Sequence, residues 1–114
     1  MNNQQHQTVH NTATEAIKYL ASTDEECARA KSLAEGLSHK IKRVKAIKFL
    51  SAKGTVAERE ATAYSSVEYE AIIEEHQNAV ADYEILRNKR NTANAQFEWA
   101  RSMNANRRMA GGNL

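Results

Sequence analysis

Residues 40–60 read KIKRVKAIKFLSAKGTVAERE, and this stretch decides how the chain folds. Its apolar residues recur three apart up to Ile47, as they do along one face of a helix. Gly54 then follows a lysine, a helix C-terminal signal, because glycine adopts positive φ at little cost. Thr55 is followed three residues later by Glu58, which is the spacing of a capping box and begins a new helix. The stretch therefore predicts two helices joined by a tight turn at Gly54.

Upstream of this stretch, apolar residues continue three or four apart and predict a helix from about residue 24 to residue 52. The predicted apolar face consists of Cys27, Ala30, Ala34, Leu37, Ile41, Val44, Ile47 and Leu50. Thr23 with Glu26 has the spacing of a second capping box, so we expect the helix to begin there. A brief amphipathic helix is expected over 12–20. Residues 1–11 are polar and lack periodicity, which predicts a disordered tail.

Downstream of the turn, the pattern predicts a helix from about residue 56 to residue 104 that loosens at Ser65 and Ser66. From Tyr69 onward the sequence fits a heptad. One heptad position holds Tyr69, His76, Tyr83, Arg90 and Phe97, and the other holds Ile72, Ala79, Leu86, Ala93 and Ala100. Residues 109–114 are expected to fray. The predicted fold is all-α: one antiparallel, coiled-coil-like hairpin domain over 12–108, with a short N-terminal and a long C-terminal helix.

The composition bounds what such a chain can bury. It has 114 residues and no proline, and its large aromatic bulk comes from two Phe and one Trp besides four Tyr. A hairpin of this kind has a thin core, so we expect a homo-oligomer. The single Cys27 excludes an internal disulfide, and no apolar run approaches the roughly 20 residues of a membrane span. The expected location is the cytoplasm, without a membrane partner.

Charge is zoned along the chain. Residues 40–53 contain six Lys and Arg and no acid, whereas residues 55–86 contain eight Asp and Glu and one Arg. Folding at Gly54 predicts that Lys48 lies near Glu60 and that Lys40 lies near Glu68. Exposed pairs contribute only about 0–1 kcal/mol each, so they select the register more than they stabilise it. The lysine-rich run has another interpretation, binding of nucleic acid or an anionic membrane, but the facing acids favour the structural one.

The C-terminal segment keeps a basic excess. Residues 87–108 hold six Lys and Arg with Glu98 as the only acid. Arginines next to an aromatic ring are typical of proteins that grip phosphates and stack bases. The candidate nucleic-acid-binding residues are Arg87, Lys89, Arg90, Trp99, Arg101, Arg107 and Arg108. Asp24 and its acidic neighbours are within reach of Arg87 to Arg90 across the hairpin. The alternative interpretation is a solvated helix end whose cations complement the helix dipole.

No catalytic or metal-binding constellation is evident in the sequence. Cys27 and His39 are not spaced as a catalytic pair, and the Glu74-Glu75-His76 segment lacks a second histidine at the spacing of a metal-binding helix. There is no glycine-rich phosphate loop. We therefore expect a protein that is not an enzyme and that needs no cofactor and no metal.

Three stretches in order resemble a known group of proteins. They are AKGTVAEREA at 52–61, YEILRNKR at 83–90, and WARS at 99–102 with NANRR at 104–108. They are similar to stretches of short, mostly uncharacterised α-helical proteins of tailed bacteriophages and prophages, often encoded among DNA replication and recombination functions. The resemblance covers about residues 24–108 and implies a biological context, not a mechanism.

These observations leave three hypotheses open. The first is a non-enzymatic phage accessory protein of DNA metabolism that binds single-stranded DNA or a recombination protein through the basic C-terminal helix. The second is a protein-interaction module, a small inhibitor or adaptor that uses the acidic residues 68–84 against a host protein. The third is a coiled coil of virion assembly.

Overall fold

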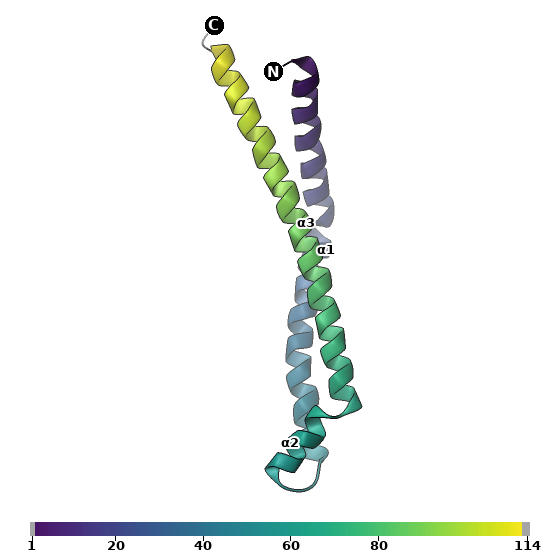
Figure 1. Ribbon diagram of the computed structural model, residues 1–114. Helices are drawn as coiled ribbons and strands as arrows, with labels where there is room; N and C mark the ends of the chain where they lie inside the picture. The colour runs from purple at the N-terminus through teal and green to yellow at the C-terminus, as the bar shows by residue number, and fades with distance from the viewer. Residues whose placement is uncertain (1, 113–114) are drawn as a thin grey trace. The chain divides into compact units, whose positions relative to one another are not determined.

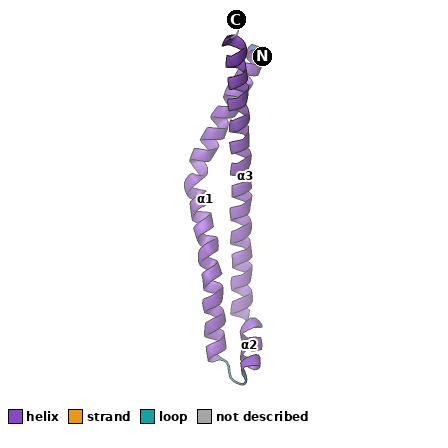
Figure 2. Ribbon diagram, turned by 90° about the vertical axis from the view of Figure 1, so that its left-hand side faces the viewer, coloured by secondary structure: helices purple, strands orange, loops and turns teal. Residues whose placement is uncertain are grey.

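The computed structural model describes residues 2–112, which form three helices and no strand. They are α1 (Asn3–Ser51), α2 (Val56–Tyr64) and α3 (Val67–Gly112). Helix α1 packs against α3, with α2 beside the connecting turn (Figures 1 and 2), so the predicted all-α hairpin is confirmed. The chain divides into two compact units, which we describe separately: unit 1 is Met1–Glu26 with Ile85–Leu114, and unit 2 is Cys27–Glu84.

Heptads on both long helices form the contact seam, the line of residues along which α1 and α3 face each other. On α3, the side chains at both predicted heptad positions are buried or half-buried, which confirms that prediction. On α1, the matching series of buried or half-buried residues is Val9, Ala16, Thr23, Ala30, Leu37 and Val44. Sustained seven-residue spacing keeps one stripe of each helix against its partner. Several of the most buried seam residues are alanines, whereas large seam side chains such as Tyr83, Leu86 and Phe97 are only half-buried.

The buried cluster of unit 2 is formed by Ala34, Leu37, Ile72 and Ala79 and is covered by Ile41, Val44 and Val80. Two residues of the predicted face do not join it: Ile47 is 55% exposed and Leu50 is 76% exposed. The heptad that includes Ile41 continues at Lys48, which is half-buried, so the seam bypasses both. The prediction for Ile47 and Leu50 was wrong because spacings of three and four cannot distinguish the seam from its flank.

The turn forms as predicted. Gly54 has φ +109°, a conformation that favours glycine. The Thr55 hydroxyl accepts a hydrogen bond from the Glu58 amide at 3.2 Å and caps α2. The loosening expected at Ser65 and Ser66 is a complete break. Ser66 Oγ accepts from the Tyr69 amide at 3.2 Å and caps α3, so the predicted third helix is two helices.

Thr23 does not begin a helix, because α1 passes through it without interruption. Its hydroxyl donates to the Tyr19 carbonyl oxygen at 2.7 Å, one turn back along α1. The separate helix expected over 12–20 is therefore part of α1. The capping-box spacing of Thr23 and Glu26 does not start a helix here, because Thr23 lies in the seam, where it is only 8% exposed.

The N-terminal segment also differs from the prediction, since residues 3–11 belong to α1 and not to a disordered tail. Val9 is 2% exposed and continues the heptad backward from Ala16. Asn2 caps the helix: its Oδ1 accepts from the Gln5 amide at 2.8 Å, and its amide donates to Gln5 Oε1 at 2.7 Å. This reciprocal pair is a capping box. Burial of one apolar side chain against α3 orders a segment whose composition is almost entirely polar.

At the other end, α3 extends through Gly112, so residues 109–112, expected to fray, are helical, whereas Met1, Asn113 and Leu114 lie outside the described residues. The register of the charges is shifted as well. Lys48 Nζ lies 3.1 Å from Glu68 Oε1, in place of the predicted pairs of Lys48 with Glu60 and Lys40 with Glu68. Because α2 occupies its own short stretch after the turn, α3 begins later than an uninterrupted helix would place it.

Candidate nucleic-acid interface

The C-terminal half of α3 lies in unit 1 and is oriented by its buried alanines. Ala93 is 5% exposed and Ala100 is 0% exposed, and both pack in the seam against α1. With 3.6 residues per turn, these two positions fix the direction of every other side chain on this part of the helix. The seven candidate residues can therefore be assigned to faces.

Arg90 lies in the seam and is bonded to α1. Its Nη1 donates to the Leu20 carbonyl oxygen at 2.7 Å and to Thr23 Oγ1 at 2.6 Å, and its Nη2 donates to the Asp24 carboxylate. The side chain is 20% exposed. The predicted pairing of Asp24 with the Arg87–Arg90 region is confirmed. Because these bonds use its guanidinium donors inside the protein, we leave Arg90 out of the proposed nucleic-acid-binding surface.

The other arginines fall on a common stripe. Arg87, Arg101 and Arg108 are separated by multiples of seven residues, and all three are exposed. With a rise of about 1.5 Å per residue, Arg101 and Arg108 lie roughly 10 Å apart along the axis. Asn94 occupies the remaining position of the same stripe. We call Arg87, Asn94, Arg101 and Arg108 the arginine stripe.

Within this stripe, Arg101 is part of an ion pair. Arg101 Nη1 lies 3.5 Å from Glu98 Oε2, one turn earlier on the same helix, and both side chains are more than half exposed. Such a pair is worth about 0–1 kcal/mol and is screened by salt. Glu98 therefore reduces the local positive charge without removing the Arg101 guanidinium from the surface.

Arg107 lies near the C-terminal end of α3, close enough to His6 to affect its charge. Burial lowers the pKa of the His6 imidazole below its usual 6.5, and the nearby Arg107 cation lowers this pKa further. His6 Nε2 is buried and has no hydrogen-bond partner among residues 2–112. Both effects disfavour the charged imidazole, so His6 adds no positive charge here near neutral pH.

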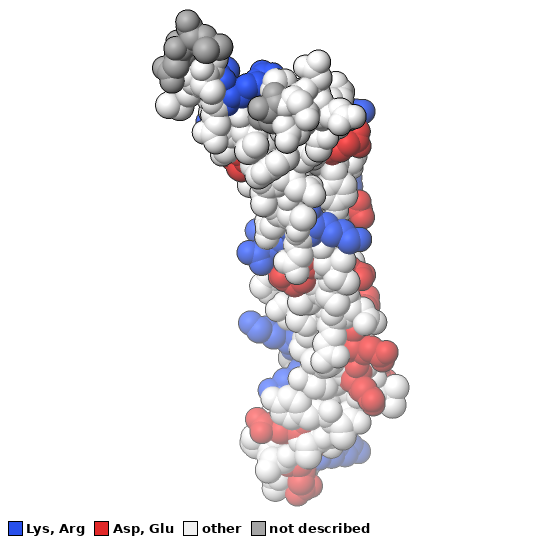
Figure 3. All heavy atoms as spheres, turned by 45° about the horizontal axis from the view of Figure 1, so that its top comes forward, with Lys and Arg blue, Asp and Glu red and all other residues white. Residues whose placement is uncertain are grey.

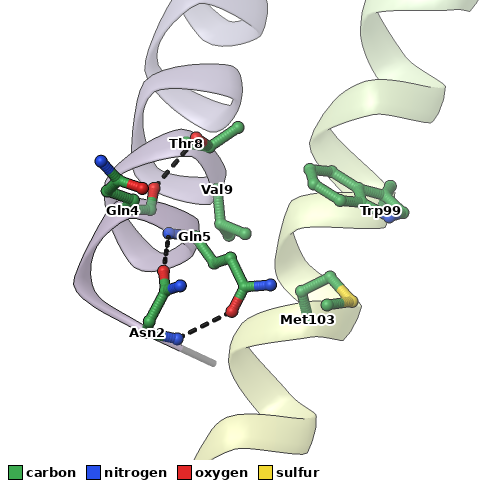
Figure 4. Close-up of a pocket in the computed structure, with 7 residues that line it drawn as sticks. All are labelled: Asn2, Gln4, Gln5, Thr8, Val9, Trp99 and Met103. Atoms are coloured by element: carbon green, nitrogen blue, oxygen red, sulfur yellow. Dashed lines mark hydrogen bonds between the residues drawn. The ribbon is translucent and has the colours of Figure 1, made fainter.

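Trp99 does not lie on the arginine stripe. Two residues along a helix correspond to a rotation of about 200°, so Trp99 points away from Arg101. Figure 4 shows Trp99 and Met103 from α3 opposite Val9, beside the capping pair Asn2 and Gln5. Together with Gln4 and Thr8 they line an open groove of about 540 Å³. The structure therefore separates the aromatic ring from the cations that the sequence suggested would act with it.

Lys89 is exposed and lies neither on the arginine stripe nor on the groove that Trp99 lines. Two features of this site were missed by sequence reasoning, His6 as a seam residue and the seven-residue spacing of Arg87, Arg101 and Arg108. Both could have been found by following seven-residue spacings, from Leu20 through Ala13 back to His6 and from Arg87 through Asn94 to Arg101 and Arg108. Within residues 2–112, no three His, Cys, Asp or Glu side chains are grouped so that they could hold a metal ion.

Over the described part of the chain, no helix has the length and apolarity needed to cross a membrane. Comparison of the chain with protein-family models, with curated proteins and with solved structures found no match.

Proposed function

We propose that this chain is a non-enzymatic accessory protein of phage DNA metabolism that binds single-stranded DNA through the arginine stripe and Arg107. The observation that supports this most directly is the common orientation of Arg87, Arg101 and Arg108 along one continuous helix. Cations spaced on one line can follow a phosphate backbone without reading its sequence. The phage context comes from the resemblance of the three sequence stretches.

The distribution of charge favours unit 1 as the binding part. Unit 1 contains seven Lys and Arg against five Asp and Glu, whereas unit 2 contains nine of each, so unit 1 accounts for the formal net charge of +2. The acids of unit 1 other than Glu98 lie on α1 between Glu15 and Glu26. Residues 2–14, which pair with the end of α3, have no Lys, Arg, Asp or Glu. The electrostatic attraction for phosphates is therefore strongest at the end that carries Arg101, Arg107 and Arg108.

The lysine-rich part of α1 is a weaker candidate. In the space-filling view of Figure 3, basic and acidic side chains run along opposite edges over much of unit 2. Lys48 is paired with Glu68, and Lys45 donates a hydrogen bond to the Tyr64 hydroxyl. The acids of α3 offset the field of these lysines within their own unit.

The test is a fluorescence-anisotropy titration of a labelled oligothymidine at two salt concentrations. We expect the triple variant Arg101→Ala, Arg107→Ala, Arg108→Ala to bind more weakly. Its slope of log affinity against log salt should be shallower by about 2, because each contact with single-stranded DNA contributes about 0.7. Since Trp99 points away from the stripe, its fluorescence should change little on binding, whereas a base stacked on the ring would quench it.

The matched control is the triple variant Lys31→Ala, Lys40→Ala, Arg43→Ala, which removes the same charge from exposed positions of unit 2. It should retain most of the affinity and the salt slope. Absence of binding by the unmodified chain at low salt would refute the proposal, and an equal loss in both triple variants would refute its location on the arginine stripe.

A second candidate is an adaptor that binds a basic host protein through the acidic part of α3. The observation in its favour is that Glu70, Glu74, Glu75 and Asp82 are exposed in unit 2. Changing Glu70, Glu74 and Glu75 to Gln would abolish such an interaction and leave DNA binding intact, which distinguishes the two functions.

A further inference from the structure

The tip of the hairpin in unit 2, residues 42–67, leaves large apolar side chains in solvent. Their exposed fractions range from 50% to 77%, and the residues are Ile47, Leu50, Val56, Tyr64 and Val67. Single exposed apolar residues are ordinary on protein surfaces, but several within one short segment mark an interaction site. These five side chains lie outside the α1–α3 seam.

An open groove of about 510 Å³ runs between α1 and α2 at this tip. Its lining is formed by Lys42, Lys45, Ala46, Phe49, Leu50 and Glu60. The basic residues come from α1 and the acidic residue comes from α2. The groove thus has a basic wall on α1 and an acidic wall on α2, and its lining includes half-buried Phe49 and exposed Leu50.

Contacts within the chain hold the walls in place. Lys45 donates a hydrogen bond to the Tyr64 hydroxyl, and its Nζ lies 4.3 Å from the centre of the Tyr64 ring. That hydrogen bond raises the pKa of Lys45, and nearby Glu60 raises it further. The Arg59 guanidinium lies 6.0 Å from the centre of the Phe49 ring. Lys42 is exposed at the rim and is the cation best placed to meet a partner.

We propose that this groove binds the same groove of a second copy of the chain, forming a two-fold symmetric dimer through the hairpin tips. A two-fold axis brings each patch against itself, so a patch with walls of opposite charge is complementary to its own copy. Lys42 of each copy then faces Glu60 of the other, and the two Leu50 side chains leave solvent together. This proposal does not depend on DNA binding.

The thinness of the core gives a second argument for a partner copy. The largest fully buried side chain among the described residues is Val9, and most of the buried apolar residues are alanines. Large apolar side chains such as Leu50 and Phe49 lie instead at the groove. A hairpin with little apolar burial of its own gains the remainder by association.

The test is light scattering coupled to size-exclusion chromatography over a series of concentrations of the whole chain. We expect the unmodified chain to be a dimer and Leu50→Asp to raise the dimer dissociation constant at least tenfold, since it places a carboxylate in an apolar contact. The matched control is Ile85→Asp, which introduces the same charge at an exposed apolar residue of unit 1. Circular dichroism verifies that both variants remain helical.

A charge exchange tests the two-fold symmetry. Lys42→Glu and Glu60→Lys should each weaken the dimer, whereas the double variant should restore it, because every cross-copy pair is then reversed but still complementary. A monomer at all concentrations of the unmodified chain would overturn the proposal. Equal effects of Leu50→Asp and Ile85→Asp, or failure of the double variant to recover, would exclude this groove as the interface.

Discussion

Arg90 shows how a residue chosen for its charge can have a structural function. It occupies a heptad position that aliphatic residues usually hold, and its guanidinium bonds to Leu20, Thr23 and Asp24 across the seam. The buried Thr23 hydroxyl has two hydrogen-bond partners, because it donates to the Tyr19 carbonyl oxygen and accepts from Arg90. The network fixes one position of α3 along α1.

Arg90→Ala should therefore lower the free energy of unfolding by about 1–3 kcal/mol, because it removes hydrogen bonds to partly buried acceptors. Urea denaturation measures the change. The control is Lys89→Ala, which removes the same charge from the exposed neighbouring position and should change stability by less than about 0.5 kcal/mol. Equal losses in the two variants would show that net charge matters and that the Arg90 network does not.

The glycines Gly54 and Gly36 respond in opposite directions to the same substitution. A Cβ on Gly54 meets positive φ and collides with the Glu58 carboxylate, so Gly54→Ala should destabilise the chain by about 1 kcal/mol. Gly36 lies inside α1 with nothing within 4 Å of an added Cβ, so Gly36→Ala should stabilise the folded chain by about 1 kcal/mol. Thermal unfolding of both variants checks the pair, and a shift of the same sign in both would contradict the assignment.

At the scale of the element, the N-terminal part of α1 shows that a mostly polar segment can still be an ordered helix. Residues 3–11 have only one strongly apolar side chain, Val9, and a capping pair, yet they form two and a half turns against α3. Composition averages over a window, but the seam depends on what stands at every seventh residue. The heptad was predicted on α3 from residue 69, and the same rule applied to α1 would have included this segment.

Val9→Asp should accordingly release the segment, since a carboxylate cannot replace a buried valine. Hydrogen exchange followed by mass spectrometry should show amide exchange over 3–11 about tenfold faster or more. The control is Asn11→Asp, which introduces the same charge at an exposed position two residues later. Rapid exchange of this segment in the unmodified chain would refute its place in the fold.

At the scale of the whole molecule, stability should depend on pH through His6. Its pKa lies below 6.5 in the folded chain because of burial and Arg107, and it returns to about 6.5 on unfolding. The unfolded chain therefore binds the proton more readily. The stability contributed by neutral His6 is complete above about pH 6.5 and is lost as the pH falls toward the folded pKa.

Thermal unfolding between about pH 7.5 and pH 5 measures this effect. The midpoint should fall with pH in the unmodified chain and fall less in His6→Gln, whereas His10→Gln, at an exposed position one turn away, should behave like the unmodified chain. Glu68 contributes at lower pH, because hydrogen bonding to its own backbone amide and to Lys48 lowers its pKa below 4.5. A slope unaffected by His6→Gln above pH 5 would refute the role of His6.

The sequence by itself determined the helical class, the turn at Gly54 with its Thr55 cap, a weak point at Ser65 and Ser66, and the α3 heptad. These features depend on local conformational preference and on periodicity, which neighbouring residues specify. Only the tertiary structure decided that Arg90 binds α1, that Lys48 pairs with Glu68, that residues 3–11 are helical, and that Trp99 points away from the arginine stripe. Each of these depends on the register between two helices, and that register follows from packing across the seam and from the length of α2, which no single segment encodes.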